Sequence, residues 1–532
     1  MNYEKNLESL GSDILKNIDK DEKVFVMMSR VYNIVDPALN MGIENELIKR
    51  GYKVLHLNHL EASAMDIGEE YSNMYWPFGQ HIIMGAKIIK NHKNLYPIYI
   101  TNHGCGPDTI LMHYFKKEMD NKPYLHIEVD EHSSKVGVIT RVEAFINSLK
   151  NCESNELLEK EIEEVSEAKK FKDSKEEIEV ENEIIIPYMY PYSNILKAFL
   201  ERKNKKVTIL EPVNEDTIEI GKQFSRGKEY FSLTGLMAEV INKIKNDEKE
   251  YTLYLPTDEG SETFGQYGKL IQYKALECGI KLNLEAPFIE DYLGDKDFGL
   301  EFFKALVIGD LINGLDENKK ETSLNDLIKA IKDNDMSDLY FDEKLKELNK
   351  EISKEEGRKR LLIIGEALIV NKDYLNNNLI KRLKKDYDIV KQPFAEELYM
   401  LYRDFSNKRN KTNKNYVKLL DEAKMIINRV NLILGEKSPF NKNTDSLNEI
   451  LKDKLQQYSG GSGRYRFAKL LTAENVDGII VVSSMYENTA TILKILREKY
   501  KDILKIPVLD LYFDSNINKN NEELIETLIA YL

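Results

Sequence analysis

The sequence contains little cysteine, no long apolar run and no excess of basic residues. Its three cysteines, Cys105, Cys152 and Cys278, are too few for a disulfide framework and fit a reducing compartment. No stretch approaches the ~18 apolar residues of a membrane-spanning helix, and the charged start of the chain lacks a signal peptide's apolar core. The net charge of −14 argues against non-specific nucleic-acid binding, which needs a basic surface. We therefore expect a cytoplasmic protein that binds neither membranes nor nucleic acid.

The order of apolar runs, turns and amphipathic stretches is typical of an α/β protein. KVFVMMS, near Val24, is a short apolar run of the kind found in strands that are buried on both faces of a parallel sheet. IENELIKRGYKVLHL then reads as a helix, a glycine stop and a second strand. Over 532 residues this pattern predicts two or three Rossmann-like domains, each with a doubly wound parallel sheet, together with helical insertions.

Changes in composition along the chain predict the domain boundaries. A lead at 1–22 precedes a first α/β domain at 23–150, and a charged linker at 151–182 separates it from a second α/β domain at 183–315. A charged helical segment at 316–359 leads to a third α/β domain at 360–532, which contains a helical insertion at 395–457. The first and last domains share the order strand, short loop, helix and acid-ending strand, which suggests a duplication.

Side chains suited to chemistry are concentrated in the first domain, where all eight histidines lie between His56 and His132. The runs NHGCGPD and DEHSSKVG each follow a predicted strand, and ligands bind beyond the carboxyl ends of such strands. Cys105 lies between two glycines, and a helix start at Pro107 and Asp108 would lower the pKa of its thiol. It is a candidate ligand or reactive thiol, or else a small residue in a tight turn.

A second candidate site is the run HIEVDEH. Side chains alternate along an extended strand, so His126, Glu128, Asp130 and His132 should share one side. Imidazoles and carboxylates suit zinc, iron(II) or manganese, which makes a metal site conceivable. Its candidate ligands are Cys105, His103, His126 and His132. The alternative is that Asp130, Glu131 and His132 cap the next helix or pair with Arg141.

The loop after the first strand carries Arg30, Asn33 and Asn40, which we take as candidate cofactor-binding residues. Its polar side chains could contact a ligand, or they could simply hold the loop through their own hydrogen bonds. No G-x-G-x-x-G motif is present, so the sequence does not support dinucleotide binding.

Three motifs together carry a family resemblance: TN-x-GCGPD, KPYL-x-x-E-x-DEHS and G-x-x-TR-x-EAF. With RVYNIVDPALNMGI, GKEYFS, FGQY and IIGEALIV, they resemble the 2-hydroxyacyl-CoA dehydratase and benzoyl-CoA reductase superfamily. The closest branch is the activase-related, double-cubane cluster protein-like one. The resemblance covers most of 22–315 and, more weakly, 360–532. It implies an iron–sulfur cluster held by thiolates, an ATP-dependent activase as partner, an acyl-CoA or similar substrate, anaerobic metabolism and a homodimer.

The chain departs from this pattern where the family carries cluster cysteines. Tyr230 stands at the cysteine position of a GKECYP-like motif, and Glu262 at that of a GPCRFGQY-like motif. The C-terminal loop at 483–488 reads SSMYEN where a PFGCMP-like cysteine is expected. Cys105 alone remains at a motif position, whereas a cubane needs three or four ligands, mostly thiolates. A degenerate cluster site is therefore expected.

Two functions follow from the resemblance, and whether the protein is an enzyme stays open between them. The first is a component of an activase-dependent reductive system, in which a sister subunit would supply the missing ligands. The second is a cluster-free binding or scaffold subunit, with a mononuclear metal-binding protein as a further alternative. In the enzyme reading the catalytic residues are Cys105, Asp108, Glu128, Asp130, His132 and Arg141.

Overall fold

A computed structural model of the chain divides into two compact units, Met1–Val180 and Glu181–Leu532, which are described separately as the first and second unit. The structure describes residues 2–19, 22–62, 67–71, 73–102, 105–152, 182–245, 247, 249–258, 260, 262–288, 298–352, 357–409, 414–456, 462–504, 506–516 and 520–532. The predicted linker at 151–182 therefore lies almost wholly outside the described residues, as does the candidate ligand His103.

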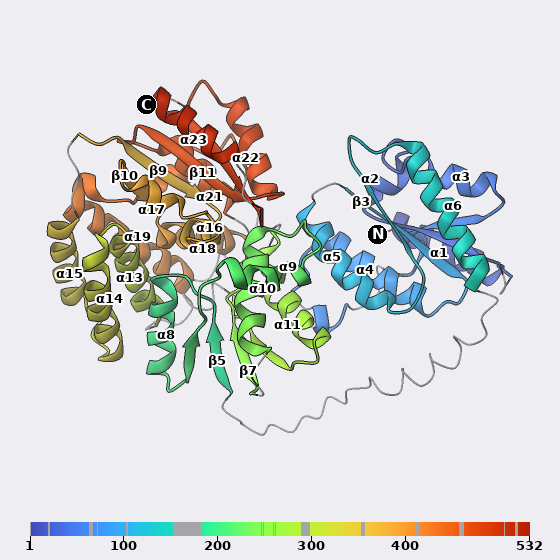
Figure 1. Cartoon of the computed structure of the whole chain (residues 1–532), viewed down its shortest axis with the longest axis horizontal. Coiled ribbons are helices and arrows are strands. Elements are labelled where there is room, and N and C mark those ends of the chain that lie inside the picture. The colour runs from blue at the N-terminus through green and yellow to red at the C-terminus, as the bar shows by residue number, and fades with distance from the viewer. Residues whose placement is uncertain are drawn as a thin grey trace. The chain divides into compact units, whose positions relative to one another are not determined.

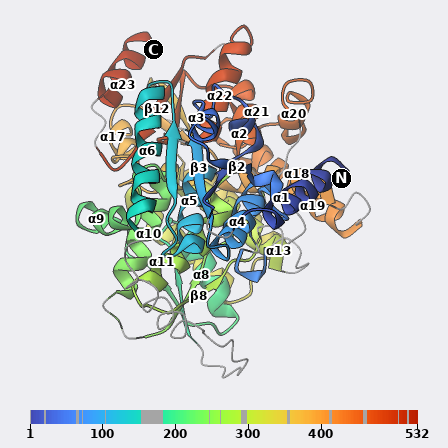
Figure 2. The same cartoon turned by 90° about the vertical axis from the view of Figure 1, so that its right-hand side faces the viewer.

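The first unit is a four-stranded parallel sheet with helices on both faces (Figures 1 and 2). The strand order is β2-β1-β3-β4, and helices α4 and α5 pack together while α3 contacts α6. Its elements are α1 (Asn2–Lys16), β1 (Val24–Met28), α2 (Val31–Val35), α3 (Ile43–Lys49), β2 (Lys53–His56), η1 (Leu57–His59), η2 (Glu69–Tyr71), α4 (Pro77–Lys90), β3 (Leu95–Asn102), α5 (Gly106–Met119), β4 (Leu125–Val129) and α6 (Lys135–Cys152).

The second unit contains two further parallel sheets, in the orders β6-β5-β7-β8 and β10-β9-β11-β12. Its first half comprises β5 (Glu183–Ile186), α8 (Tyr192–Arg202), β6 (Val207–Ile209), α9 (Glu215–Phe224), α10 (Phe231–Ile244), β7 (Tyr251–Tyr254), η3 (Phe264–Gln266), α11 (Tyr267–Glu277), β8 (Leu282–Glu285) and α13 (Phe298–Ile312). The rest comprises α14 (Glu317–Lys332), α15 (Asp338–Glu351), β9 (Arg360–Gly365), α16 (Ala367–Asn371), α17 (Leu379–Leu383), β10 (Asp388–Lys391), α18 (Phe394–Arg409), α19 (Lys414–Leu434), η4 (Gly435–Lys437), α20 (Thr444–Glu449), α21 (Gly463–Thr472), β11 (Gly478–Ser484), α22 (Asn488–Lys499), β12 (Val508–Phe513) and α23 (Asn520–Tyr531).

All three sheets have the same topology: the first strand of each lies between the second and the third. The predicted α/β class with doubly wound parallel sheets is thus confirmed, and the similarity proposed between the first and last domains extends to the middle one. In each sheet the chain reverses its direction of travel between the first and third strands. Such a switch point leaves a crevice at the carboxyl ends of the two strands, where ligands bind in this class of fold.

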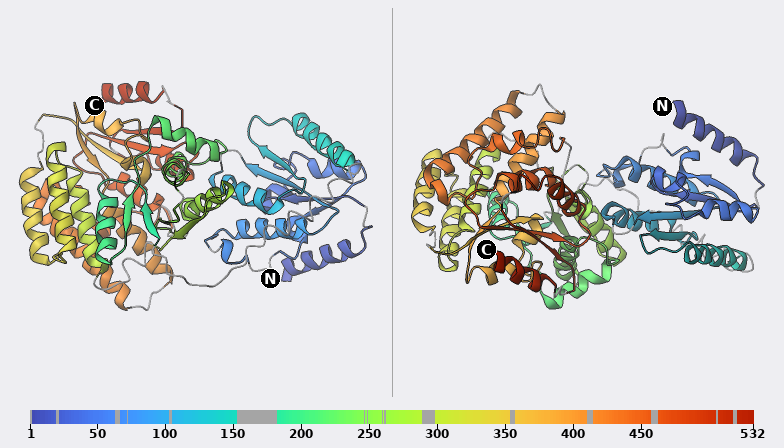
Figure 3. Two further views of the ribbon diagram at one scale, coloured as in Figure 1. Left: turned by 60° about the horizontal axis from the view of Figure 1, so that its bottom comes forward. Right: turned by 90° about the horizontal axis from the view of Figure 1, so that it is seen from above.

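The two sheets of the second unit share one hydrophobic core. That core includes Ile184 and Ile186 of β5, Leu362 of β9 and Val481 of β11, together with buried residues of the helices between the sheets. Helices α13, α14, α15 and α19 pack on one another and form a helical layer of this unit (Figure 3). The predicted second and third domains are therefore halves of one compact unit. None of the described helices is both long and apolar enough to cross a membrane.

Candidate functional site

The first unit brings Arg30, Cys105 and Asp108 together at its switch point. Arg30 follows β1, and Cys105 lies between β3 and α5. Strands β1 and β3 pair in parallel, so their carboxyl ends lie at the same edge of the sheet. The Arg30 guanidinium donates to Cys105 Sγ at 2.8 Å and to Asp108 Oδ1 at 3.1 Å. It also lies 4.2 Å from the centre of the Phe78 ring, a cation–π contact. These residues form a compact polar cluster.

The electrostatics of this cluster oppose a reactive thiolate. Burial, reinforced by the Asp108 carboxylate, raises the pKa of Cys105 to about 11, although the Arg30 charge lowers it. The expectation that the helix start would lower this pKa is therefore wrong, because desolvation outweighs the helix terminus. Because the thiolate is the nucleophile, Cys105 is poorly prepared for nucleophilic attack at neutral pH.

The other cofactor-binding candidates of the first unit hold their own loop. Asn33 is fully buried and donates to Ser29 Oγ at 3.0 Å. Asn40 donates to the Ile34 carbonyl at 2.7 Å and accepts from the Gly42 N–H at 2.9 Å. Of the two alternatives left open by the sequence, these contacts favour a loop stabilised by its own hydrogen bonds.

The HIEVDEH run does not present four side chains to one point. Strand β4 ends at Val129, and Asp130 Oδ1 accepts from the His132 N–H at 3.0 Å in the turn that precedes α6. His126 Nε2 lies 2.7 Å from Thr101 Oγ1, whereas the His132 side chain is 85% exposed. Arg141 donates to the His126 carbonyl at 2.6 Å. Glu128 lies on the same strand, β4.

Within the part of the chain that the structure describes, no three His, Cys, Asp or Glu side chains are arranged to hold a metal ion. His103, which lies outside that part, is not covered by this finding. The predicted mononuclear site stays a prediction.

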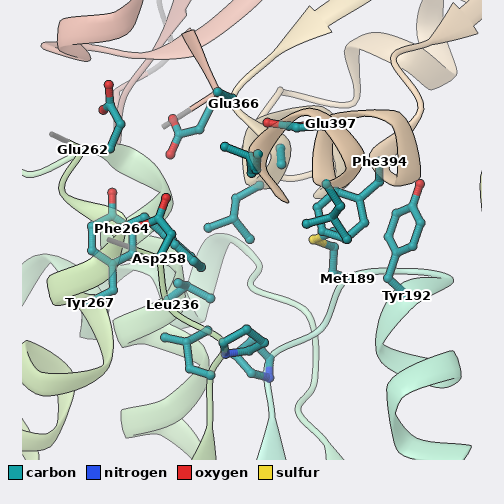
Figure 4. A pocket seen from close by; sticks show the side chains of 18 of the residues that line it. Met189, Tyr192, Leu236, Asp258, Glu262, Phe264, Tyr267, Glu366, Phe394 and Glu397 are labelled. Atoms are coloured by element: carbon teal, nitrogen blue, oxygen red, sulfur yellow. The ribbon is translucent and has the colours of Figure 1, made fainter. Parts of the chain in front are cut away.

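A cavity with a polar wall and an apolar body lies in the second unit, between its two sheets. It has a volume of about 240 Å³, and strands β5, β7, β9 and β11 direct their carboxyl ends or the following loops towards it. Much of its wall is apolar: Ile186, Met189, Leu196, Leu236, Phe264, Phe302, Phe303, Leu306, Phe394, Leu398 and Leu401. Figure 4 shows Met189 and Phe394 on one side and the carboxyl groups of Glu262 and Glu366 on the other. The cavity is thus amphipathic.

The polar wall contains four glutamates, Glu262, Glu366, Glu397 and Glu487, with the single arginine Arg466. Arg466 donates to Glu487 Oε1 at 2.6 Å, and both side chains are buried. Glu487 Oε2 and Arg466 Nε are also buried, and neither has a hydrogen-bond partner among the described residues. The wall therefore offers hydrogen-bonding atoms to a ligand, because a buried polar atom without a partner is costly.

Three of these glutamates have strongly altered acidity. Burial raises the pKa of Glu262, Glu366 and Glu397 to about 7 in each case, and the Glu487 carboxylate adds to the effect. Glu366 accepts from Ser484 Oγ at 2.6 Å and from Ser232 Oγ, and Glu262 accepts from Thr489 Oγ1. At neutral pH each carboxyl group is thus close to its titration point and can either donate or accept a hydrogen bond.

The three motif positions without cysteine all meet at this wall. Tyr230 and Glu262 line the cavity, and Tyr230 Oη accepts from the Asn488 N–H of the C-terminal loop at 2.9 Å. Ser484, in the same loop, contacts Glu366. The donor set is oxygen rather than sulfur, and the second unit's described cysteine, Cys278, is exposed and absent from the cavity lining. These residues do not fit an iron–sulfur cluster, which is a soft site that favours thiolates.

Sequence reasoning missed Glu366, Glu397, Glu487 and Arg466. A usable signal existed for two of them, because Glu366 directly follows the apolar strand RLLIIG and Glu487 is the third residue after IIVVSS. Acidic residues just beyond buried parallel strands are expected at a ligand crevice. Glu397 and Arg466 lie on helices α18 and α21, where nothing in the local pattern distinguishes them from surface charges.

Residues 1–60 match the family model described as CoA enzyme activase uncharacterised domain (DUF2229). This match supports, at a coarse level, the resemblance to proteins of CoA enzyme activation and acyl-CoA dehydration. It covers only the first strands of the first unit, and it does not reach the cavity of the second unit. No curated protein matches the chain.

Proposed function

We propose that this protein is a cluster-free relative of the acyl-CoA dehydratase group, and that its second unit binds the acyl part of a small acyl-CoA or a molecule of similar shape. It would act as a binding component of a system related to CoA enzyme activases, with an activase or a sister subunit as the expected partner. The observation that carries this proposal is the convergence of Tyr230, Glu262 and the 483–488 loop on one amphipathic cavity.

The chemistry of the cavity suits an uncharged carbonyl compound with an apolar tail. The glutamates of the polar wall would repel an anionic carboxylate, because only one arginine is present to offset their negative charge. A thioester carbonyl is neutral, and a protonated Glu262 or Glu366 can donate a hydrogen bond to it. The apolar wall would take the acyl chain, whose burial drives binding.

The absence of a cluster is tested by purifying the protein without oxygen, recording its visible absorption and measuring iron and acid-labile sulfide. We expect a colourless protein with no sulfide. A brown protein with several iron and sulfide ions per chain would contradict the proposal and favour an activase-dependent redox component. Metal without sulfide would favour the mononuclear site instead.

Ligand binding is tested by calorimetric titration with CoA and with acetyl-, butyryl- and hexanoyl-CoA. Each added CH₂ that enters the cavity should strengthen binding by roughly 0.8 kcal/mol until the cavity is full. Ala367→Phe, which fills the cavity from α16, should abolish this dependence on chain length. Leu339→Phe is the matched control, because Leu339 is 70% exposed on α15 of the same unit. Equal affinity for CoA and all three thioesters would refute acyl binding.

A further inference from the structure

The polar wall of the amphipathic cavity carries more negative charge than a neutral thioester would use. Among the described residues that line it, the charged side chains are five acids and one arginine: Asp258, Glu262, Glu366, Glu397, Glu487 and Arg466. The ion pair between Arg466 and Glu487 offsets one carboxylate. Buried carboxylates without a counter-ion must either take up protons or meet a cation. The wall therefore favours a ligand that brings positive charge.

The chain segment around Glu487 brings three of these carboxyl groups to the same part of the wall. Ser484 donates to Glu366 Oε2 at 2.6 Å, and Thr489, in the first turn of α22, donates to Glu262. Glu487 lies between these two contacts along the chain, and all three glutamates line the cavity. Figure 4 shows the carboxyl groups of Glu262 and Glu366 on the same side of the cavity. A cationic group bound there would meet carboxylates from both halves of the unit.

The ion pair of the wall leaves one donor and one acceptor for a ligand. Arg466 Nη1 donates to Glu487 Oε1 at 2.6 Å, and the two side chains are only 4% and 3% exposed. Arg466 Nε and Glu487 Oε2 are buried as well, and neither has a hydrogen-bond partner among the described residues. The nitrogen is a donor and the oxygen an acceptor. The complementary ligand therefore has an acceptor and a donor next to each other, as a carbonyl oxygen and an ammonium group on adjacent carbon atoms do.

We propose that the cavity takes a 2-aminoacyl group with an apolar side chain, so that its ligand class is an aminoacyl thioester. The carbonyl oxygen would accept from Arg466 Nε, and the ammonium group would donate to Glu487 and to the carboxylate of Glu262 or Glu366. The side chain of the ligand would lie against the apolar wall, on the side of Met189 and Phe394. This inference rests on the proposed function, because it names the acyl group that the same cavity would bind.

The acidity of the wall supplies a signature of cation binding. Burial raises the pKa of Glu262, Glu366 and Glu397 to about 7, so at neutral pH these groups hold protons in part. A bound ammonium group favours the ionised carboxylates and lowers their pKa again. Binding of an amine should therefore release protons, whereas binding of an uncharged ligand should not.

Three amides with the same chain length test the ligand class: 2-aminohexanamide, 2-hydroxyhexanamide and hexanamide. They differ only in the group on the second carbon, and the amino group is mostly protonated at pH 7 because its ordinary pKa is about 8. In calorimetric titration of the full chain at pH 7, 2-aminohexanamide should bind at least tenfold more tightly than each of the other two. Titration in two buffers of different ionisation enthalpy should show proton release for the amine alone.

The same titrations contain the results that would overturn the proposal. The first is equal or tighter binding of hexanamide or 2-hydroxyhexanamide, and tight binding of the hydroxyl compound would identify a hydroxyacyl site instead. The second is no saturable binding of 2-aminohexanamide. The third is binding of this amine without proton release, because a carboxylate cluster that meets a cation must lose protons.

Variants locate the amine within the cavity. Glu487→Gln keeps the shape of the side chain and removes its charge, so it should weaken binding of 2-aminohexanamide at least tenfold and change that of hexanamide less than twofold. Because this change leaves Arg466 buried without its counter-ion, Glu262→Gln serves as the second variant. Thr489 can still donate to its amide oxygen, and the preference for the amine should fall severalfold.

Glu219→Gln is the matched control, because Glu219 is 63% exposed on α9 and does not line the cavity. Circular dichroism establishes which variants are folded. An unchanged preference for the amine in the folded cavity variants would overturn the proposal, and if both misfold, the three amides on the wild-type protein decide.

The thioester series separates failure of this proposal from failure of the proposed function. If affinity for the acyl-CoA series rises with chain length while the three amides bind equally, the cavity binds acyl groups and the amino group is refuted. If affinity for the thioesters does not depend on chain length, acyl-CoA binding fails, whatever the preference among the amides.

Discussion

The buried ion pair between Glu239 and Lys372 is expected to control the stability of the second unit. Lys372 Nζ lies 2.5 Å from Glu239 Oε1, and the two side chains are 2% and 0% exposed. Glu239 belongs to α10 and Lys372 follows α16, so the pair joins the two halves of the unit. Glu239 also accepts from the N–H groups of Val213 at 3.3 Å and Tyr188 at 3.2 Å.

Replacing Lys372 by Met keeps the length of the side chain and removes its charge. Glu239 would then be a buried carboxylate with two N–H donors and no counter-ion. Removing one partner of a buried pair typically costs about 3–5 kcal/mol, and we expect a loss of that size at pH 8. Lys381→Met, which removes an exposed pair with Asp373 on the same half of the unit, should cost less than about 1 kcal/mol.

The loss should depend on pH with a definite sign. Burial already raises the pKa of Glu239, and without Lys372 the folded-state pKa rises further. The folded state then binds a proton that the unfolded state releases, so stability falls as pH rises through this range. The gap between Lys372→Met and wild type should therefore be smallest near pH 4.5 and largest near pH 8. Glu239→Gln in the Lys372→Met background should remove this pH dependence and recover part of the loss.

Urea denaturation followed by circular dichroism measures this free energy of unfolding. The single tryptophan, Trp76, is buried in the first unit, so its fluorescence reports that unit and should show an unchanged transition. A loss below 1 kcal/mol, or a gap that does not change between pH 4.5 and pH 8, would refute the reasoning about an uncompensated buried charge.

Two smaller predictions concern the other sites. A pKa of about 11 leaves Cys105 with roughly a hundredth of the thiolate of an ordinary cysteine at pH 7. Peptide mapping should therefore find Cys105 alkylated far more slowly than exposed Cys278, and Asp108→Asn should accelerate the alkylation of Cys105. Equal alkylation rates for the two cysteines would contradict the burial argument. Since burial raises the pKa of Glu366 to about 7, its contribution to stability is complete below the ordinary value and is lost as pH rises towards 7. Glu366→Gln should therefore reduce the pH dependence of unfolding between pH 5 and pH 8 by roughly 3 kcal/mol, and an unchanged slope would show that the carboxyl group is ionised throughout.

The fold could be predicted from the sequence because it is encoded locally. The central strands of the three sheets are short, largely apolar runs. VFVMM in β1 and GIIVVSS in β11 are examples, and both of these strands are buried at every position. Strand burial on two faces needs such continuous runs, and helices with one apolar face follow between them. The union of the second and third domains into one unit was not predicted, because it depends on side chains of separate helices packing in a shared core.

The candidate site of the first unit was predicted in part. Arg30, Cys105 and Asp108 do meet, because the loops after two neighbouring parallel strands must share one edge. The metal site predicted at the HIEVDEH run stays a prediction, but its four side chains do not share one face, because alternation holds only while the chain is extended and β4 ends at Val129. No residue type within the HIEVDEH run marks the position at which the strand ends.

By itself, the sequence determined the α/β class, the order of strands and helices, and the motif positions where Tyr230, Glu262 and the 483–488 loop stand in place of cysteine. Those properties depend on residue type and spacing along the chain. Only the tertiary structure decided that these three positions, of which the last is more than two hundred residues from the other two, surround one amphipathic cavity. Burial and the sum of nearby charges fix the acidity of these groups, and both are set by distances in space that no local pattern records.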